Sequence, residues 1–236
     1  MKDLVWYWLV ILAIYLFFIA MLGYKTSSRR WWGILIDSRN KASLSQFQLV
    51  LWTTLIVPLF AAVGIKNGTM NIVLTNEILA LLGISLASAG GALIIKSNKA
   101  ATEPDPAKSK ETLTGIPRRG LLQVNPVAAQ DKAAGQAGTP QGPKFSDIFL
   151  GEEVVDYTYV DISKVQMFVF TLAAAVGYGF VLWAWNFAPQ PPPAGAAPGT
   201  EALISFPLLS TSLVTLIGIS HAGYLAMKAP NKTPAK

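Results

Sequence analysis

Two serine–glutamine pairs form the most specific polar pattern in the sequence. Ser45 and Gln48 make one Ser-x-x-Gln unit, and Ser163 and Gln166 make the other. This spacing is typical of a capping box, in which the two side chains satisfy backbone amides at the start of a helix. Unpaired amides are costly at membrane depth, so we interpret both pairs as structural caps. The functional alternative places the two glutamines together at a polar site.

His221 is the only histidine of the chain and lies in an apolar run. An ionisable residue inside a membrane span is a candidate functional site. A neutral histidine can also bond a backbone carbonyl, and a lone histidine without a carboxylate or thiolate nearby makes a poor metal site. We favour the structural interpretation and keep His221 as a weak functional candidate.

The sequence lacks the residues that most catalytic and metal-binding sites need. The chain has no cysteine, which excludes disulfides, thiolate metal sites and cysteine nucleophiles. No nucleophile–base pair, intramembrane carboxylate pair, phosphate-binding glycine loop or metal-ligand spacing occurs. An enzyme would need Asp37, Asp147 or His221, and nothing in the sequence pairs them. We therefore predict a protein that is not an enzyme, without catalytic residues, metal or cofactor.

Long apolar runs must position these polar groups. Hydrophobic residues make up 52% of the 236 residues, and charged residues only 14%. A helix of about 20 residues crosses a hydrocarbon core of about 30 Å. The sequence therefore predicts an all-α membrane protein with five transmembrane helices, at Leu4–Tyr24, Gln46–Ile65, Glu77–Ile95, Lys164–Phe187 and Leu203–Met227.

Lysine and arginine predict the orientation, because cytoplasmic loops carry an excess of both. Of the cations, only Lys2 and Lys66 fall on one side of the predicted membrane, and the others follow the first, third and fifth runs. We expect the N-terminus outside and the C-terminus inside. The net charge of +6 then reflects orientation and not nucleic-acid binding.

The chain also repeats itself. Residues 44–53 match residues 162–171, and Leu81–Ser85 matches Leu216–Ser220. We predict one leading helix plus two parallel-repeated hairpins, related by a pseudo-twofold axis along the membrane normal. The predicted organisation is a first transmembrane helix at 1–24, an interfacial segment at 25–45, a first hairpin at 46–96, a cytoplasmic loop at 97–144, a second interfacial segment at 145–163, a second hairpin at 164–228 and a cytoplasmic tail at 229–236.

Small residues on the returning helices predict close helix packing. We expect the serine of each Gly-Ile-Ser stretch to bond a backbone carbonyl or a neighbouring helix, and a permeation path lined by these residues is the functional alternative. The residues concerned are Gly83, Ser85, Ala87 and Gly91 in the first hairpin, and Gly218, Ser220 and Ala222 in the second.

Residues 97–144 contain no aromatic residue and are rich in alanine, proline, glycine, lysine and glutamine. Such a stretch buries too little apolar surface to offset its ordering entropy. We expect it to be largely disordered, with at most local structure around Ile116–Val127. A docking segment for a cytoplasmic partner and a simple spacer are both open.

Several motifs resemble a family of uncharacterised bacterial membrane proteins. They are Ile36 to Asn40, Ser43 to Thr53, Asp161 to Phe168 and the two Gly-Ile-Ser stretches. The resemblance covers most of the membrane part but not the loop between Ala100 and Gly142. It implies a bacterial inner-membrane location and no particular activity.

We expect a non-catalytic integral membrane subunit that acts as an anchor or scaffold. Its expected partners are the lipid bilayer, copies of itself or other subunits, and a cytoplasmic protein at the 97–144 loop, but not nucleic acid. The alternative is a channel or transporter subunit with a pore on the repeat or oligomer axis. Ion-coupled transport usually needs buried carboxylates or discontinuous helices, and here only Pro58 lies well inside a span.

Overall fold

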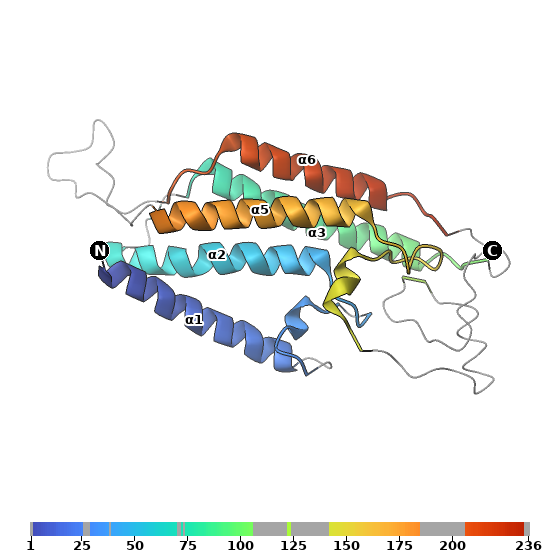
Figure 1. The fold of residues 1–236 in the computed structure, drawn as a ribbon, viewed down its shortest axis with the longest axis horizontal. Helices are drawn as coiled ribbons and strands as arrows, with labels where there is room; N and C mark the ends of the chain where they lie inside the picture. The colour runs from blue at the N-terminus through green and yellow to red at the C-terminus, as the bar shows by residue number, and fades with distance from the viewer. Residues whose placement is uncertain are drawn as a thin grey trace.

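The computed structural model describes residues 2–25, 29–37, 39–69, 72, 74–105, 122–123, 142–184 and 206–233. Within these residues the fold is all-helical, with five long helices and no strand (Figure 1). Four of them, α1, α2, α3 and α5, are long and apolar enough to cross a membrane. The long helices are α1 (Lys2–Lys25), α2 (Leu44–Asn67), α3 (Asn76–Ala100), α5 (Ile162–Ala184) and α6 (Thr211–Lys228).

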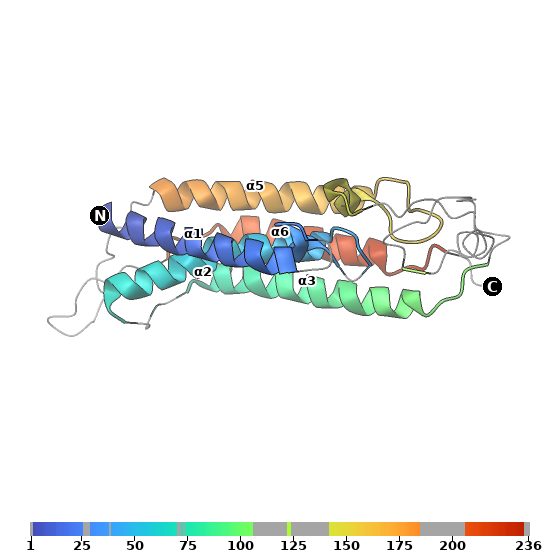
Figure 2. The ribbon, with the colours of Figure 1, turned by 90° about the horizontal axis from the view of Figure 1, so that it is seen from below.

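Helices α2, α3, α5 and α6 form a bundle around a common apolar core. α3 lies against α6, α5 lies against α6, and α2 contacts both α3 and α5 (Figures 1 and 2). Burial of these side chains supplies the main favourable term for packing the bundle's interior. The largest buried apolar and aromatic side chains of this core include Trp52, Leu59, Leu81, Tyr178, Leu182 and Ile217.

Helix α1 lies on the outside of the bundle, against α2 (Figure 2). Its Tyr15 hydroxyl donates to Thr53 Oγ1 at 2.9 Å, while its outward surface exposes apolar side chains such as Phe17. Its end approaches the following segment closely at Gly23, where a Cβ atom would lie 2.5 Å from the Trp31 carbonyl oxygen. Only glycine allows this approach.

The segments that precede α2 and α5 are built alike, and we call them the pre-helix segments (residues 29–37 with 39–43, and residues 142–161). Each contains a 3-10 helix, η1 (Gly33–Leu35) or η2 (Phe145–Phe149). An antiparallel bridge follows each, and the long helix begins two residues after it. The bridges are Ile36 with Ala42, spanning five residues, and Leu150 with Val160, spanning nine.

Polar residues mark two helix starts. The Thr75 hydroxyl accepts the amide of Ile78 at the start of α3. The Asp161 carboxylate accepts the amide of Ser163 at 3.0 Å at the start of α5. Both are the short polar residues that satisfy free amides at a helix N-terminus.

Helix α6 is shorter than the run at Leu203–Met227 suggested. It begins at Thr211, and residues 206–210 are not helical. Pro207 lies in this stretch, where its missing amide and its restriction of the preceding residue disfavour a helix. Helix α3 ends at Ala100 and so includes residues 97–100, the first residues of the predicted loop.

Candidate functional site

One end of the bundle carries a network of buried ion pairs, which we call the charged end. It comprises the two pre-helix segments, the starts of α2 and α5, and the ends of α3 and α6. Glu152 lies at its centre, in the longer of the two bridged loops. Its carboxylate oxygens face four cations, at 2.8 Å from Lys228 Nζ, 3.0 Å from Lys164 Nζ, 3.4 Å from Lys96 Nζ and 3.5 Å from Arg39 Nη1.

These cations keep Glu152 ionised. Burial by itself would raise the pKa of the Glu152 carboxyl, but the nearby charges of Lys164, Lys228, Lys96 and Arg39 outweigh it and hold the pKa well below its ordinary value. Four cations from four different elements thus converge on one carboxylate. A buried carboxylate with such partners links the elements that carry them, and removal of one partner leaves a buried charge uncompensated.

Asp37 provides the second carboxylate of the network. It pairs with Arg39, accepting from the Arg39 guanidinium and, at 3.0 Å, from the Arg39 amide. Lys96 Nζ lies 3.9 Å from the same carboxylate. Around Asp37 and Glu152 together, four cations therefore face two carboxylates among the described residues.

Lys41 joins the two pre-helix segments from within. Only 1% of the residue is exposed, and its ammonium donates to the carbonyl oxygen of Gly151 at 2.5 Å. The ammonium also lies 4.9 Å from the centre of the Tyr157 ring. Burial, and next the charge of Lys164, lowers the pKa of Lys41 to about 7. Near neutral pH the Lys41 amine is therefore partly protonated and partly neutral.

The loop and the tail dock on the same end. The Leu122 amide donates to the Glu152 carbonyl oxygen at 2.9 Å, and Gln123 is buried against Lys99. Glu153 accepts the Lys99 ammonium at 2.5 Å and the backbone amides of residues 232 and 233 at 2.9 Å. Leu122 and Gln123 fall in the stretch for which local structure was predicted. Most of the rest of the 97–144 loop lies outside the described residues.

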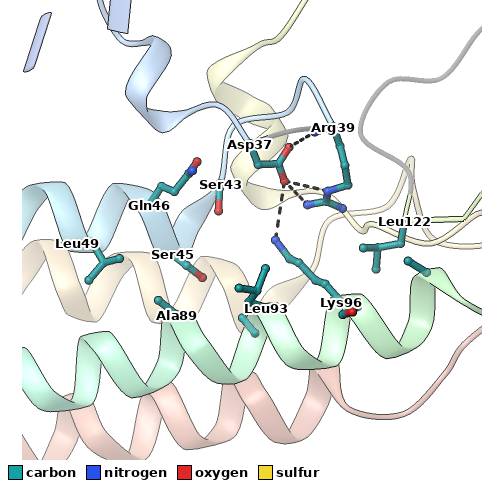
Figure 3. Close-up of a pocket in the computed structure, with 13 residues that line it drawn as sticks. Asp37, Arg39, Ser43, Ser45, Gln46, Leu49, Ala89, Leu93, Lys96 and Leu122 are labelled. Atoms are coloured by element: carbon teal, nitrogen blue, oxygen red, sulfur yellow. Dashed lines mark hydrogen bonds and ion pairs between the residues drawn. The ribbon is translucent and has the colours of Figure 1, made fainter. Parts of the chain in front are cut away.

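A pocket of about 450 Å³ lies beside this network, between the start of α2 and the last turns of α3 (Figure 3). Its lining changes character along its length. Arg39, Lys96 and the Asp37 carboxylate lie at the charged end, and Leu49, Ala89 and Leu93 lie deeper along the helices (Figure 3). The pocket thus presents a charged side and an apolar side.

The structure corrects the prediction that Ser45 and Gln48 form a capping box. The N-cap of α2 is Ser43, so Ser45 is already inside the helix. Gln48 points into the bundle, where its Nε2 donates to Thr171 Oγ1 at 2.7 Å and lies 3.2 Å from His221 Nε2. This polar trio joins α2, α5 and α6 through buried side chains.

The second predicted cap, Ser163 with Gln166, is also wrong. Ser163 donates its hydroxyl to Asp161, which accepts the amide at this helix start, and Gln166 is exposed. The two glutamines therefore do not meet at a common site.

The predicted packing residues divide into two groups. A Cβ atom on Gly91 would lie 3.2 Å from Leu225, and one on Gly218 would lie 3.5 Å from Ile84, so both glycines lie where α3 meets α6. Gly83, Ala87 and Ala222 are instead exposed on the bundle surface. Ser85 and Ser220 are buried, but neither hydroxyl has the expected hydrogen-bond partner within the described residues.

The ion-pair network was missed at the sequence level. In the sequence its lysines and arginines predict only the orientation, and Glu152 is not among the candidate residues. A signal was present, because Lys164 begins a predicted span and a buried lysine needs a nearby acid or acceptor. No group of three or more histidine, aspartate or glutamate residues in the described part of the chain could hold a metal ion. Comparisons of the chain with family models, curated proteins and solved structures find no match.

Proposed function

We propose that this protein is a non-catalytic membrane scaffold. Its charged end forms a rigid platform at the cytoplasmic face of the membrane. The observation that carries the proposal is the network around Glu152. It fixes α3, α5, α6 and the first pre-helix segment to one loop through buried ion pairs. A platform fixed at so many points suits a docking role, because its shape persists without a ligand.

The proposal includes five membrane helices with the N-terminus outside. Helix α6 is the fifth, since it lies beside α3 and α5 and ends with Lys228 at the charged end. The concentration of lysine and arginine at that end supports a cytoplasmic position. The like-built pre-helix segments support two duplicated hairpins, and the sequence motifs support a bacterial inner-membrane location.

The packed interior favours a scaffold over a channel along the bundle axis. Trp52, Leu59 and Met167 are each at most 1% exposed and fill the space between the four helices. An open pore would need a polar, hydrated lining along its length. A pore between copies of the chain is the second candidate, and it shares the prediction of an oligomer.

Native mass spectrometry of gently solubilised complexes tests the scaffold. The expected result is a soluble protein that co-purifies in fixed stoichiometry and is lost when Tyr159 is replaced by alanine. Tyr159 is 64% exposed on the platform, whereas Leu208, at the other end of the bundle, is 78% exposed and serves as the matched control. A closed homo-oligomer without other proteins, combined with ion leakage from reconstituted liposomes, would overturn the scaffold in favour of the pore.

Single cysteines test the orientation, because the chain contains no native cysteine. A cysteine at Asn67 should react with an impermeant reagent on intact spheroplasts. A cysteine at Ser146, which is exposed in η2, should react only after lysis. Labelling of position 146 from outside would reverse the proposed topology.

A further inference from the structure

The pocket beside the charged end has an apolar part and a charged part. Its apolar part is formed by Leu49 on α2 and by Ala89 and Leu93 on α3. Leu93 is 68% exposed, and with Leu86 and Ile94 it continues onto the outward apolar surface of α3. An apolar ligand segment in this part of the pocket would therefore be continuous with the lipid phase.

The other part of the pocket favours an anion. Arg39 and Lys96 point into it together with Asp37 (Figure 3). The charged residues that line the pocket are two cations, Arg39 and Lys96, and one carboxylate, Asp37, so one more negative charge would balance the lining. Lys96 holds its two carboxylates at 3.4 and 3.9 Å, more loosely than Lys164 and Lys228 hold Glu152.

Neutral polar groups complete the charged part. Ser43 and Gln46, at the start of α2, also line the pocket (Figure 3). The buried Gln46 Oε1 atom has no hydrogen-bond partner in the described residues. A buried acceptor of this kind is costly unless a donor reaches it. A ligand hydroxyl beside an anionic group would supply that donor.

We infer that this pocket binds the headgroup of an anionic, hydroxyl-bearing phospholipid, with the first part of an acyl chain along Leu49, Ala89 and Leu93. The phosphate binds Lys96 and Arg39 from the open side of the pocket, and a headgroup hydroxyl donates to Gln46. Ala89 and Lys96 are seven residues apart on α3, or roughly 10 Å along the helix, which spans a phosphate and the start of a chain. The volume of about 450 Å³ lies in the range of ordinary small-molecule sites.

Lipid titration of the delipidated full-length protein, followed by native mass spectrometry, tests this site. Phosphatidylglycerol should bind the wild type at one tight site per chain and more tightly than phosphatidylcholine. Lys96→Gln should weaken phosphatidylglycerol at least about tenfold, as expected for loss of one charge-assisted bond. Lys232→Gln is the matched control, because Lys232 pairs with Asp156 outside the pocket.

A second pair of variants tests the apolar part without changing charge. Ala89→Phe fills the pocket from α3 and should abolish the tight site. Ala87→Phe adds the same group to the same helix at an exposed position outside the pocket and should leave it intact. Equal binding of the wild type and Ala89→Phe would overturn the assignment.

Two further ligands distinguish the source of the chemistry. Glycerol 3-phosphate should compete only weakly, because it lacks the acyl chain. Competition as strong as that of the lipid would show a site for a free phosphate compound and not for lipid. Diacylglycerol binding as tightly as phosphatidylglycerol would show that the cations contribute nothing, and would also overturn the inference.

Discussion

The side-chain amide of Gln48 lies 3.2 Å from Nε2 of His221, although 173 positions separate the two residues along the chain. The same amide donates to Thr171 at 2.7 Å. A single polar side chain of α2 thus binds both helices of the other predicted hairpin. Burying such a group is favourable only when it is hydrogen-bonded, so the trio fixes how the two hairpins face each other.

The trio predicts energetic coupling between Gln48 and His221. Gln48→Ala and His221→Ala should each lower the free energy of unfolding in detergent, and the double variant should lose less than the sum. The expected coupling is about 0.5–1 kcal/mol, in the range measured for hydrogen bonds between membrane helices. Gln166→Ala is the control, because Gln166 occupies the corresponding position in the other hairpin but is exposed. Simple additivity of Gln48 and His221 would contradict the trio.

Glu152 should be the most sensitive single residue of the charged end. Glu152→Gln leaves Lys164, Lys228, Lys96 and Arg39 facing a neutral amide, and we expect the free energy of unfolding to fall by about 3–5 kcal/mol. Glu77→Gln, at the opposite end of α3, should change it little. The measurement is denaturant unfolding in mild detergent, and equal effects of the two substitutions would refute the role of Glu152.

The depressed pKa of Glu152 also predicts a pH dependence. A carboxyl with a lower pKa in the folded state contributes its full stabilisation above the pKa of the unfolded chain, near 4.5, and loses it as the pH falls through the folded value. The difference in stability between the wild type and Glu152→Gln should therefore be constant from pH 8 to about 5 and shrink in stronger acid. A difference that already shrinks between pH 8 and 6 would argue against this origin.

Lys41 predicts a dependence of the same sign, with stability rising with pH, but in a higher pH window. Its pKa is about 7 in the folded protein against 10.5 ordinarily, so the unfolded chain binds more protons between these values. Stability contributed by Lys41 should rise with pH across this window. Relative to Lys41→Met, which cannot titrate, the wild type should become steadily more stable from pH 7 to 10. Thermal unfolding of both proteins at a series of pH values measures this. Parallel pH profiles would show that the pKa of Lys41 is not lowered in the folded protein.

The apolar helices were predictable because their length and composition are sufficient to identify them. The role of Gln48 was not, since Gln48 and Gln166 are each the fifth residue of their helix, yet only Gln48 is buried. Which face of a helix meets its neighbours depends on the packing of the whole bundle. The repeated motif therefore predicted the location of both residues along their helices but not the partner of either.

Glu152 was harder to predict for a different reason. It lies in a loop outside the apolar runs, and its partners come from positions as distant as Arg39 and Lys228. Local sequence contains no information on which lysines converge. The correspondence of the two pre-helix segments offered one indirect indication. The second bridged loop is four residues longer, nine against five, and holds three acidic residues where the first holds only Asp37.

The distance along the chain between Glu152 and Lys228 sets an order of events during biogenesis. Glu152 leaves the ribosome 76 residues before Lys228, or roughly 4 to 15 s earlier at usual rates of synthesis. Arg39, Lys96 and Lys164 can reach it by the time α5 has been synthesised. Lys228 is synthesised only at the end of α6. Residues 232 and 233, whose backbone amides donate to Glu153, follow it. The ion-pair network of the charged end is therefore completed last, after the other helices of the bundle have been synthesised.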